Sequence, residues 1–167
     1  MDKQELIQLV TQKLNDQVSG AIENSELSYD FPVFYIHKDK IHDALSVLKN
    51  DADLNFHFLT DLTGFQTADE KELGVIYHLH NMPKNYRIRV KTFFDIGKPE
   101  IPTATDLWPG ANWMERETYD FFGVKFKGHP NLKRILNVDE MDIFPLRKEY
   151  PLEDQTREDK SDKMFGR

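Results

Sequence analysis

Hydrophobic residues recur at helical spacing in two segments of the N-terminal part of the sequence. The first apolar face consists of Leu6, Val10 and Leu14, and the second of Ile41, Ala44, Leu45 and Leu48. Residues three or four apart lie on one side of a helix, so both segments are predicted to be amphipathic helices. Asp2 followed by Glu5 is a capping-box pattern at the start of the first helix, and Gly20 marks its end.

Strand-forming residues dominate four other segments, namely 31–36, 56–60, 75–80 and 86–94. In the last segment, the apolar positions are Tyr86, Ile88, Val90 and Phe94, and Arg87, Arg89 and Lys91 stand between them. This alternation predicts one strand face in the core and one in water. We expect the last two segments to pair as an antiparallel hairpin. Pro32 is consistent with an edge strand or with the start of a strand.

A dense run of aromatic, charged, glycine and proline residues, here called the signature segment, occupies positions 108–151. Asn112 and Glu115 have the spacing of a capped helix start, and Gly123 suits the left-handed residue that ends many helices. Beyond it the chain is predicted to extend briefly and to turn sharply within 124–130. The fold class is therefore α+β: a mixed or antiparallel sheet with packed helices, followed by the signature helix and an extended C-terminal segment.

The length of 167 residues is typical of one domain, which we place at residues 1–151. Residues 152–167 mix both charge signs and contain few large apolar side chains. They are predicted to form a charged tail that is mobile in the isolated protein and becomes ordered on a neighbouring subunit.

The composition excludes several classes of function. The chain has no Cys, so it cannot hold a thiolate-ligated iron–sulfur cluster or zinc ion, and nothing points to an oxidising compartment. Its net charge of -7 argues against nucleic acid and anionic membrane surfaces as partners. The start lacks a signal-peptide pattern, and no apolar run approaches the ~20 residues that span a bilayer. We expect an intracellular chain that does not insert into a membrane.

Catalytic and metal sites are only weakly indicated. His78 and His80 face the same side of a predicted strand, but no third ligand is placed beside them. The candidates for an acid and a base are Glu115, Glu117 and Asp120. On one exposed helix these carboxylates are more typical of ion pairs. His129, between a glycine and a proline, suits a structural hydrogen bond better than a titrating role. We therefore assign no catalytic, cofactor-binding or metal-binding residue.

The aromatic content of the signature segment favours a docking module. Its large aromatic residues include Trp108, Trp113, Tyr119, Phe121, Phe122 and Phe126. One short helix cannot bury all of them, and aromatic side chains beside Arg are common anchors of protein interfaces. An exposed patch of aromatic and Arg side chains would distinguish docking from catalysis in a concave pocket.

The signature segment resembles the 30 kDa subunit family of respiratory complex I, the NADH:quinone oxidoreductase. The matching residues are Glu115-Arg116-Glu117, Asp120, Gly123, Gly128-His129-Pro130 and Pro145-Leu146-Arg147-Lys148-Glu149-Tyr150-Pro151. A weaker likeness extends upstream through 59–64 and 75–79. The chain departs from the family pattern at Gln66 and Asn131, where an acidic residue is usual, and in 141–144, where Trp and Gly are usual.

The resemblance implies a subunit without a redox centre in the hydrophilic arm, on the cytoplasmic side of the inner membrane. There it would support electron transfer from NADH to quinone, coupled to ion translocation. The implied partners are the quinone-site subunit of the 49 kDa type and the subunit with the last iron–sulfur cluster. The complex as a whole would use NADH, FMN, iron–sulfur clusters and quinone. The same domain occurs in ferredoxin-fed and hydrogenase-type relatives, so the electron donor stays open, and a stand-alone acid–base or metal enzyme is a third alternative.

The resemblance also suggests which residues contact a partner. We expect the interface to include Glu115, Arg116, Glu117, Asp120, Gly128, His129, Pro130, Arg134, Arg147 and Lys148. A charge at an exposed rim contributes little to folding. Reversing Arg116 or Arg147 is therefore expected to leave the isolated fold nearly as stable and to impair assembly.

Overall fold

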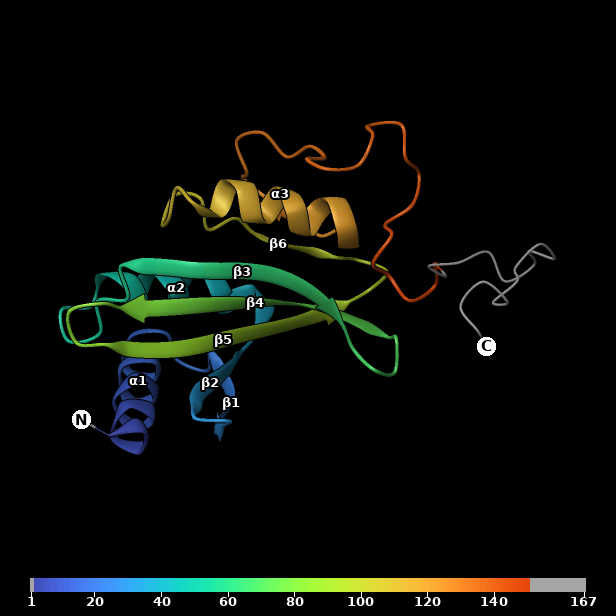
Figure 1. Cartoon of the computed structure of the whole chain (residues 1–167). Helices are drawn as coiled ribbons and strands as arrows, with labels where there is room; N and C mark the ends of the chain where they lie inside the picture. Colours follow the sequence, from blue (N-terminus) through green and yellow to red (C-terminus); the bar gives the residue numbers. More distant parts are fainter. Residues whose placement is uncertain (1, 151–167) are drawn as a thin grey trace, which may run out of the picture.

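The computed structural model describes residues 2–150, which contain a five-stranded sheet, a two-stranded sheet and three α-helices (Figure 1). The helices are α1 (Lys3–Gln17), α2 (Ile41–Asn50) and α3 (Ala111–Phe122), with a 3-10 turn η1 at Lys38–Lys40. The strands are β1 (Ile22–Ser28), β2 (Phe31–Ile36), β3 (Phe58–Gln66), β4 (Glu72–Asn81), β5 (Tyr86–Asp95), β6 (Glu100–Pro102) and β7 (Lys125–Lys127). The large sheet has the order β1-β2-β5-β4-β3, with only β2 and β5 parallel, and β6 pairs in parallel with β7. The predicted α+β class with a mixed sheet is confirmed.

Local sequence signals determine the ends of two helices. The Asp2 carboxylate accepts the Glu5 N–H at 2.8 Å, and the Glu5 carboxylate accepts the Asp2 N–H at 2.8 Å, so the predicted capping box of α1 is present. Gly123 ends α3 with a φ of 74°, the left-handed conformation predicted for it. The antiparallel hairpin of β4 and β5 is also confirmed.

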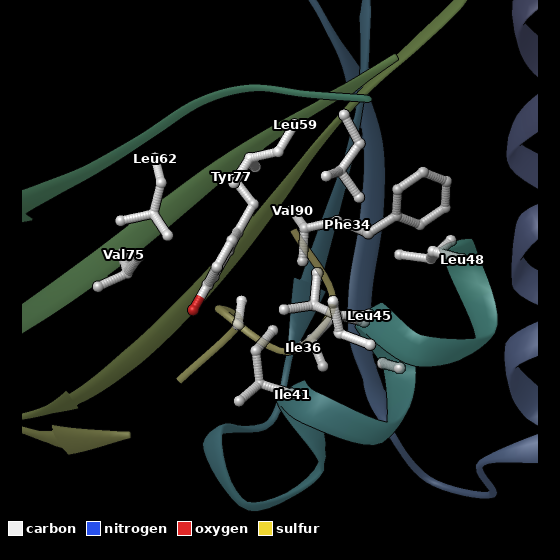
Figure 2. Packing of buried hydrophobic residues seen from close by; sticks show 14 of the residues in the cluster. Phe34, Ile36, Ile41, Leu45, Leu48, Leu59, Leu62, Val75, Tyr77 and Val90 are labelled. Carbon is white, nitrogen blue, oxygen red and sulfur yellow. The ribbon is translucent and has the colours of Figure 1, made fainter. Parts of the chain in front are cut away.

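The hydrophobic core lies on one face of the large sheet, against α1 and α2 (Figure 2). The sheet contributes Phe34, Ile36, Leu62, Val75, Tyr77 and Val90, and α2 contributes Ile41, Leu45 and Leu48. Tyr77 on β4 lies opposite Leu62 of β3 and Val90 of β5, so one buried row crosses three strands. Such cross-strand rows stabilise the register, because a shift by one residue would turn every side chain to the other face.

The helix α3 packs along β3, and residues 128–150 run over the side of α3 that faces away from the sheet (Figure 1). The approach of α3 is close at Gly64, where a Cβ atom would come within 2.8 Å of Thr118 and Phe122. Glycine at this position of β3 therefore allows the helix to contact the strand backbone. We call α3 and residues 123–150 the signature layer.

Two details of the strands differ from expectation, and Pro32 agrees with one of the two alternatives given for it, the start of a strand. The segment 56–60 is not one strand: β3 begins at Phe58, and Phe56 is buried in the preceding connection with its N–H bonded to the Leu48 carbonyl. Pro32 is near the start of β2 but not on an edge, because β2 lies between β1 and β5. The edge strand β1 was not predicted, since most of its side chains are polar or exposed.

The two faces of β5 are expected to differ strongly in their contribution to stability. Ile88 is 0 % exposed, whereas Arg89 points to the opposite, partly solvated face. Replacing Ile88 by Ala leaves a core cavity, so the free energy of unfolding should fall by about 2–5 kcal/mol. Arg89→Ala should cost well under half of that. Urea unfolding of both variants checks this, and a larger effect of Arg89→Ala would contradict the assignment of the core face.

Candidate functional site

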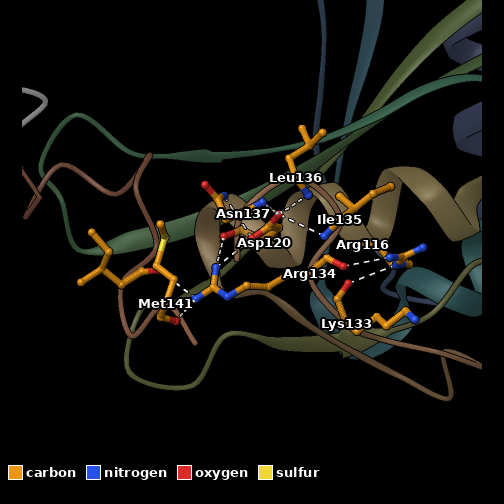
Figure 3. Close-up of polar contacts among 9 residues, drawn as sticks. Arg116, Asp120, Lys133, Arg134, Ile135, Leu136, Asn137 and Met141 are labelled. Atoms are coloured by element: carbon orange, nitrogen blue, oxygen red, sulfur yellow. Dashed lines mark hydrogen bonds and ion pairs between the residues drawn. The ribbon is translucent and has the colours of Figure 1, made fainter. Parts of the chain in front are cut away.

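A buried carboxylate organises the centre of the signature layer. Asp120 on α3 is 0 % exposed, and one of its oxygens accepts the backbone N–H groups of three consecutive residues. These donors are Ile135 at 3.1 Å, Leu136 at 2.8 Å and Asn137 at 2.9 Å. The other oxygen accepts from Nη1 of Arg134 at 2.8 Å (Figure 3). Burial alone raises the pKa of Asp120, but the hydrogen bonds from Asn137, Arg134 and the other two amides hold it well below its usual range.

Two arginines fasten the C-terminal segment to α3. Nη2 of Arg134 donates to the carbonyl oxygens of Met141 and Ile143, the latter at 2.9 Å. Arg116 donates from Nε to the Lys133 carbonyl at 3.1 Å and from Nη2 to the Arg134 carbonyl at 2.8 Å. Loops carry backbone carbonyls that need partners when they are buried. The guanidinium groups supply those partners, so the irregular path of residues 133–143 is fixed by side chains of α3 and by Arg134.

Glu115 is a second fully buried carboxylate of α3 and faces the connection between β6 and the helix. It accepts the Thr103 hydroxyl and the Ala104 N–H, each at 2.6 Å. Burial raises the pKa of Glu115 to about 7, although the two hydrogen bonds act in the opposite direction. The predicted capping pair of Asn112 and Glu115 is therefore wrong: the helix begins at Ala111 without a side-chain cap, and Glu115 bonds elsewhere.

His129 fixes the turn that follows β7. Its Nε2 lies 3.1 Å from the Asn112 carbonyl oxygen, and its Nδ1 accepts the Asn131 N–H at 3.0 Å. The neighbouring Gly128 has a φ of 86° and thus a left-handed conformation. These two contacts occupy both ring nitrogens, which agrees with the structural role expected for His129.

The end of the signature layer returns to the sheet. Arg147 donates to the Phe122 carbonyl at 2.7 Å and lies over the Phe144 ring. The Lys148 N–H donates to the Gln66 side-chain oxygen at 2.7 Å. Gln66, where the family pattern usually has an acidic residue, thus bonds to the end of the signature layer. Pro151 and the predicted tail at 152–167 lie outside the described residues.

The expected rim of exposed charges needs correction. Glu115, Arg116, Asp120 and Arg134 are buried, and their polar groups bond within the chain. They cannot simply be reversed without loss of stability, because a buried charge without a partner is costly. Arg147 is also mostly covered, with 12 % of its side chain exposed. Of the other expected contact residues, Glu117, Gly128, Pro130 and Lys148 are exposed and His129 is half-buried.

The outer surface of the signature layer carries large apolar side chains among exposed charges, and the sequence predicted only part of this. Its exposed large apolar side chains are Trp113, Leu136, Val138, Ile143 and Leu146. Trp113 is 62 % exposed and lies over the guanidinium of Arg116. Leu136 and Val138 are 67 % and 63 % exposed. The sequence indicated Trp113 as an aromatic anchor. It did not indicate that Leu136 and Val138 are exposed, because they lie in a charged, irregular segment without hydrophobic periodicity.

The histidines of β4 do not assemble a metal site in the part of the chain that the structure describes. Among residues 2–150 there is no group of three or more His, Asp or Glu side chains placed to hold a metal ion. Nε2 of His78 accepts from Nε of Arg89 at 2.8 Å. Burial lowers the pKa of His78, and Arg89 lowers it further, which suits a neutral acceptor.

Glu115 makes stability depend on pH in a direction that can be tested. Its folded-state pKa of about 7 exceeds the ordinary 4.5, so the folded chain holds an extra proton between these values. The stabilisation from that proton is full below pH 4.5 and is lost as the pH rises through about 7, by up to about 3 kcal/mol. Glu115→Gln should remove this slope, because an amide does not ionise. Its oxygen can still accept the Ala104 N–H, and its NH2 group can donate to the Thr103 hydroxyl oxygen.

The measurement for Glu115 is the difference in unfolding free energy between wild type and Glu115→Gln from pH 5 to pH 8. The difference is needed because His78, with a lowered pKa, contributes a slope of opposite sign below about pH 6.5. The variant should gain on the wild type as the pH rises. Parallel profiles for the two proteins would show that Glu115 does not titrate in this range.

The chain matches known proteins over most of its length. Residues 34–156 match the family described as "Respiratory-chain NADH dehydrogenase, 30 Kd subunit". It is 37% identical over 153 residues to the C-type subunit of NADH-quinone oxidoreductase from Roseiflexus sp. (strain RS-1), covering 91% of this chain and 86% of that protein. It is 44% identical over 124 residues to the corresponding NADH-quinone oxidoreductase subunit of Citrifermentans bemidjiense, covering 74% and 76%.

Two solved structures share the fold. One is a chain from the structure of the membrane-bound sulfane sulfur reductase, an archaeal respiratory membrane complex, with a TM-score of 0.73 and 27% identity over 89% of this chain and 86% of that one. The other is a trypsin-resistant fragment of Nqo5, with a TM-score of 0.63 and 25% identity over 79% of this chain and 100% of the fragment.

Proposed function

We propose that this chain, which belongs to the family of 30 kDa subunits of the respiratory-chain NADH dehydrogenase, is a docking subunit of an NADH-quinone oxidoreductase. It holds no redox centre of its own. Its role is to join and stiffen the hydrophilic arm through which electrons pass from NADH to quinone, a reaction coupled to ion translocation. The signature layer is the surface through which it does so.

The observation that carries the proposal is the contrast between the inside and the outside of the signature layer. Inside, Asp120, Arg134 and Arg116 bond to one another's groups and to backbone groups of the same chain. Outside, apolar side chains such as Leu136 and Val138 are left in water. A rigid segment that presents apolar side chains binds with a small loss of conformational entropy, because its backbone is already ordered.

The proposed partners are the quinone-site subunit of the 49 kDa type and the subunit that carries the last iron–sulfur cluster. In this proposal the polar rim of the interface is formed by the exposed members of the expected contact set, namely Glu117, Lys148 and the turn at 128–130. NADH, FMN, iron–sulfur clusters and quinone are bound by other subunits. No helix within residues 2–150 has the length and apolar character needed to cross a membrane. We place the chain at the cytoplasmic face of the inner membrane, held there by its partners.

The proposal predicts that the purified chain is colourless and oxidises no NADH. A chain without Cys has no thiolate for an iron–sulfur cluster. Absorption spectra and NADH turnover with a soluble quinone measure this, with the intact complex as positive control. Flavin or haem absorption in a 1:1 ratio, or quinone-dependent turnover by the pure chain, would contradict the proposal. Removing the chain from the complex should abolish electron transfer to quinone.

A second candidate is the equivalent subunit of a complex that uses a different donor or acceptor. The observation in its favour is the chain of the sulfane sulfur reductase structure, which covers more of this chain than the Nqo5 fragment does. Both candidates need the same docking surface. Mass spectrometry of the subunits that co-purify with the chain decides between them: an NADH-binding flavoprotein supports the first, and its absence from an otherwise intact complex supports the second.

A further inference from the structure

The large sheet has a second face, opposite the core, that no helix of the described chain covers (Figure 1). In the view of Figure 1, α2 lies behind β3, β4 and β5, and the face toward the viewer is bare. We call it the open sheet face. Its half-buried or exposed side chains include Phe31, Tyr35, Phe65, His78, Arg87, Arg89, Lys91 and Phe93.

An aromatic row crosses four strands of the open sheet face. Tyr35 of β2 stacks on Phe93 of β5 at 6.0 Å with an interplanar angle of 8°. Phe93 meets the edge of Phe65 of β3 at 5.4 Å. On the strand between them stands Gly74, where a Cβ atom would lie 2.5 Å from the Phe65 ring. Glycine at this position therefore lets the two rings meet above β4, and the row forms a continuous apolar platform.

Beside the platform, β5 carries three cations at alternate positions, Arg87, Arg89 and Lys91. Arg89 lies over Phe31 at 5.2 Å and Lys91 over Tyr35 at 5.3 Å. None of the three forms a salt bridge within the described residues, although other cations of the chain do. The chain as a whole has 29 acidic residues against 22 basic ones, so three cations at alternate positions of one strand are a local concentration of positive charge. Such a stretch suits an external anion.

The acidic groups near the open sheet face either contact residues of the same chain or lie at the end of β4 and β5 away from the three cations. Glu26 accepts the Tyr35 hydroxyl at 2.7 Å, and Asp61 lies 3.7 Å from Nδ1 of His78. Glu72 and Asp95 pair opposite each other at the far end of β4 and β5, beyond the aromatic row. Along β5 the face is thus basic from Arg87 to Lys91, apolar at Phe93 and acidic at Asp95, while Glu26 and Asp61 lie beside Tyr35 and His78 on neighbouring strands.

We propose that the open sheet face is a second docking site and that its occupant is an extended, acidic segment of a neighbouring protein subunit. Alternate residues of a strand are about 7 Å apart, and so are alternate residues of an extended peptide. Carboxylates at every second position can therefore lie over Arg87, Arg89 and Lys91, followed by an apolar side chain on the Phe93 platform. The inference rests on the proposed function for the existence of a neighbouring subunit.

A surface cavity adjoins the basic end of this site. Its volume is about 640 Å³, and its lining is mixed in charge, with Asp2, Lys3, Leu6, Asp30, Phe31, Pro32, Lys84, Asn85, Tyr86 and Arg87. Phe31 and Arg87 belong to both features, so the occupant can continue from the sheet face into the cavity. Aromatic and basic sheet faces also bind single-stranded nucleic acid. The basic stretch covers only three alternate positions of β5 and ends before Glu72 and Asp95. It therefore suits a short acidic protein segment better than a continuous phosphate backbone, which needs an extended basic surface.

Photo-crosslinking in the assembled complex tests the site. A benzophenone amino acid replaces Phe93 in one preparation and Trp113, on the signature layer, in another. Crosslinks from position 93 to a subunit segment with acidic residues at alternate positions support the inference. Crosslinks to nucleic acid, to a segment without such acids, or to nothing while position 113 reacts would overturn the inference and leave the proposed function standing. A chain that assembles with no subunits at all would overturn both.

Charge reversal gives an independent readout. Arg89→Glu with Lys91→Glu should weaken retention of the chain in the complex by at least tenfold at low salt and by less at high salt. The matched control is Lys71→Glu with Lys98→Glu, which makes the same change in net charge at two exposed positions outside both the basic stretch of β5 and the signature layer. Thermal melting shows that the double variant is folded. Equal retention of the folded variant and the control would contradict the proposal.

Discussion

Asp120→Ala is expected to lower the free energy of unfolding by about 3–5 kcal/mol, the largest effect of any single polar substitution in the chain. The carboxylate is fully buried, caps three consecutive amides and pairs with Arg134. Its removal leaves the Arg134 guanidinium buried without its anion, and breaking a buried pair in this way costs about that amount. The same hydrogen bonds and the same ion pair lower the pKa of Asp120. The stabilisation by its carboxylate is therefore present at neutral pH and is lost only in strong acid.

Denaturant unfolding at pH 7 measures the effect, with Glu117→Ala as the matched control. Glu117 is an acid on the same helix, three positions away, but it is exposed. The control should change stability by under about 1 kcal/mol. Asp120→Asn should fall between the two, because an amide oxygen can still accept N–H groups but no longer neutralises Arg134. Similar melts for Asp120→Ala and Glu117→Ala would mean that the Asp120 network does not hold the layer together.

Leu136→Asp with Val138→Asp is expected to leave the isolated fold intact and to weaken binding to the rest of the hydrophilic arm by about 30-fold or more. Both side chains are more than three-fifths exposed, so little core packing is lost. At a docked interface, however, each new carboxylate would be buried without a partner, and changes at such anchor positions cost about 2 kcal/mol or more. Reconstitution of the arm with purified variant chain, followed by size-exclusion chromatography, gives the affinity.

The matched control for this double variant lies on the opposite edge of the sheet. Leu27 on β1 and Tyr29, just after β1, are 41 % and 98 % exposed. β1 is the edge strand at the opposite end of the sheet from β3, the strand on which α3 packs. Leu27→Asp with Tyr29→Asp adds the same two charges and should bind normally. Equal loss of binding by both double variants would point to a general charge effect, and normal binding by both would remove the signature layer from the interface.

Much of the fold could be predicted because its signals are local. The capping box of α1 involves Asp2 and Glu5 only, and the alternation from Tyr86 onward needs no knowledge of the partner strands. The edge strand β1 could not be predicted, since its neighbour β2 stabilises it on one side and water accepts the rest of its polar groups. Its place in the sheet depends on the parallel pairing of β2 with β5, which no local pattern encodes.

The sequence indicates which residues of the signature layer are important, but it does not indicate that its acidic residues Glu115 and Asp120 are buried. A charged residue on a helix is read as exposed unless its partner is visible in the sequence. Besides the side chains of Thr103, Arg134 and Asn137, the partners of Glu115 and Asp120 are backbone amides of Ala104 and of residues 135–137, groups that every residue type except proline carries. The acidic signature residues therefore give no sign that they are buried. The exposure of Leu136 and Val138 has no local signal either, because the path of the backbone there depends on the bonds from the 135–137 amides to the distant Asp120.

The central claim is that the signature layer is preformed in the isolated chain and docks through its outer surface. Hydrogen–deuterium exchange of the isolated chain and of the assembled complex tests this most directly. We predict slow exchange of the 135–137 amides in both samples, because Asp120 holds them, and a gain of protection across 138–146 only in the complex. Fast exchange at 135–137 in the isolated chain, or no gain across 138–146 on assembly, would contradict the claim.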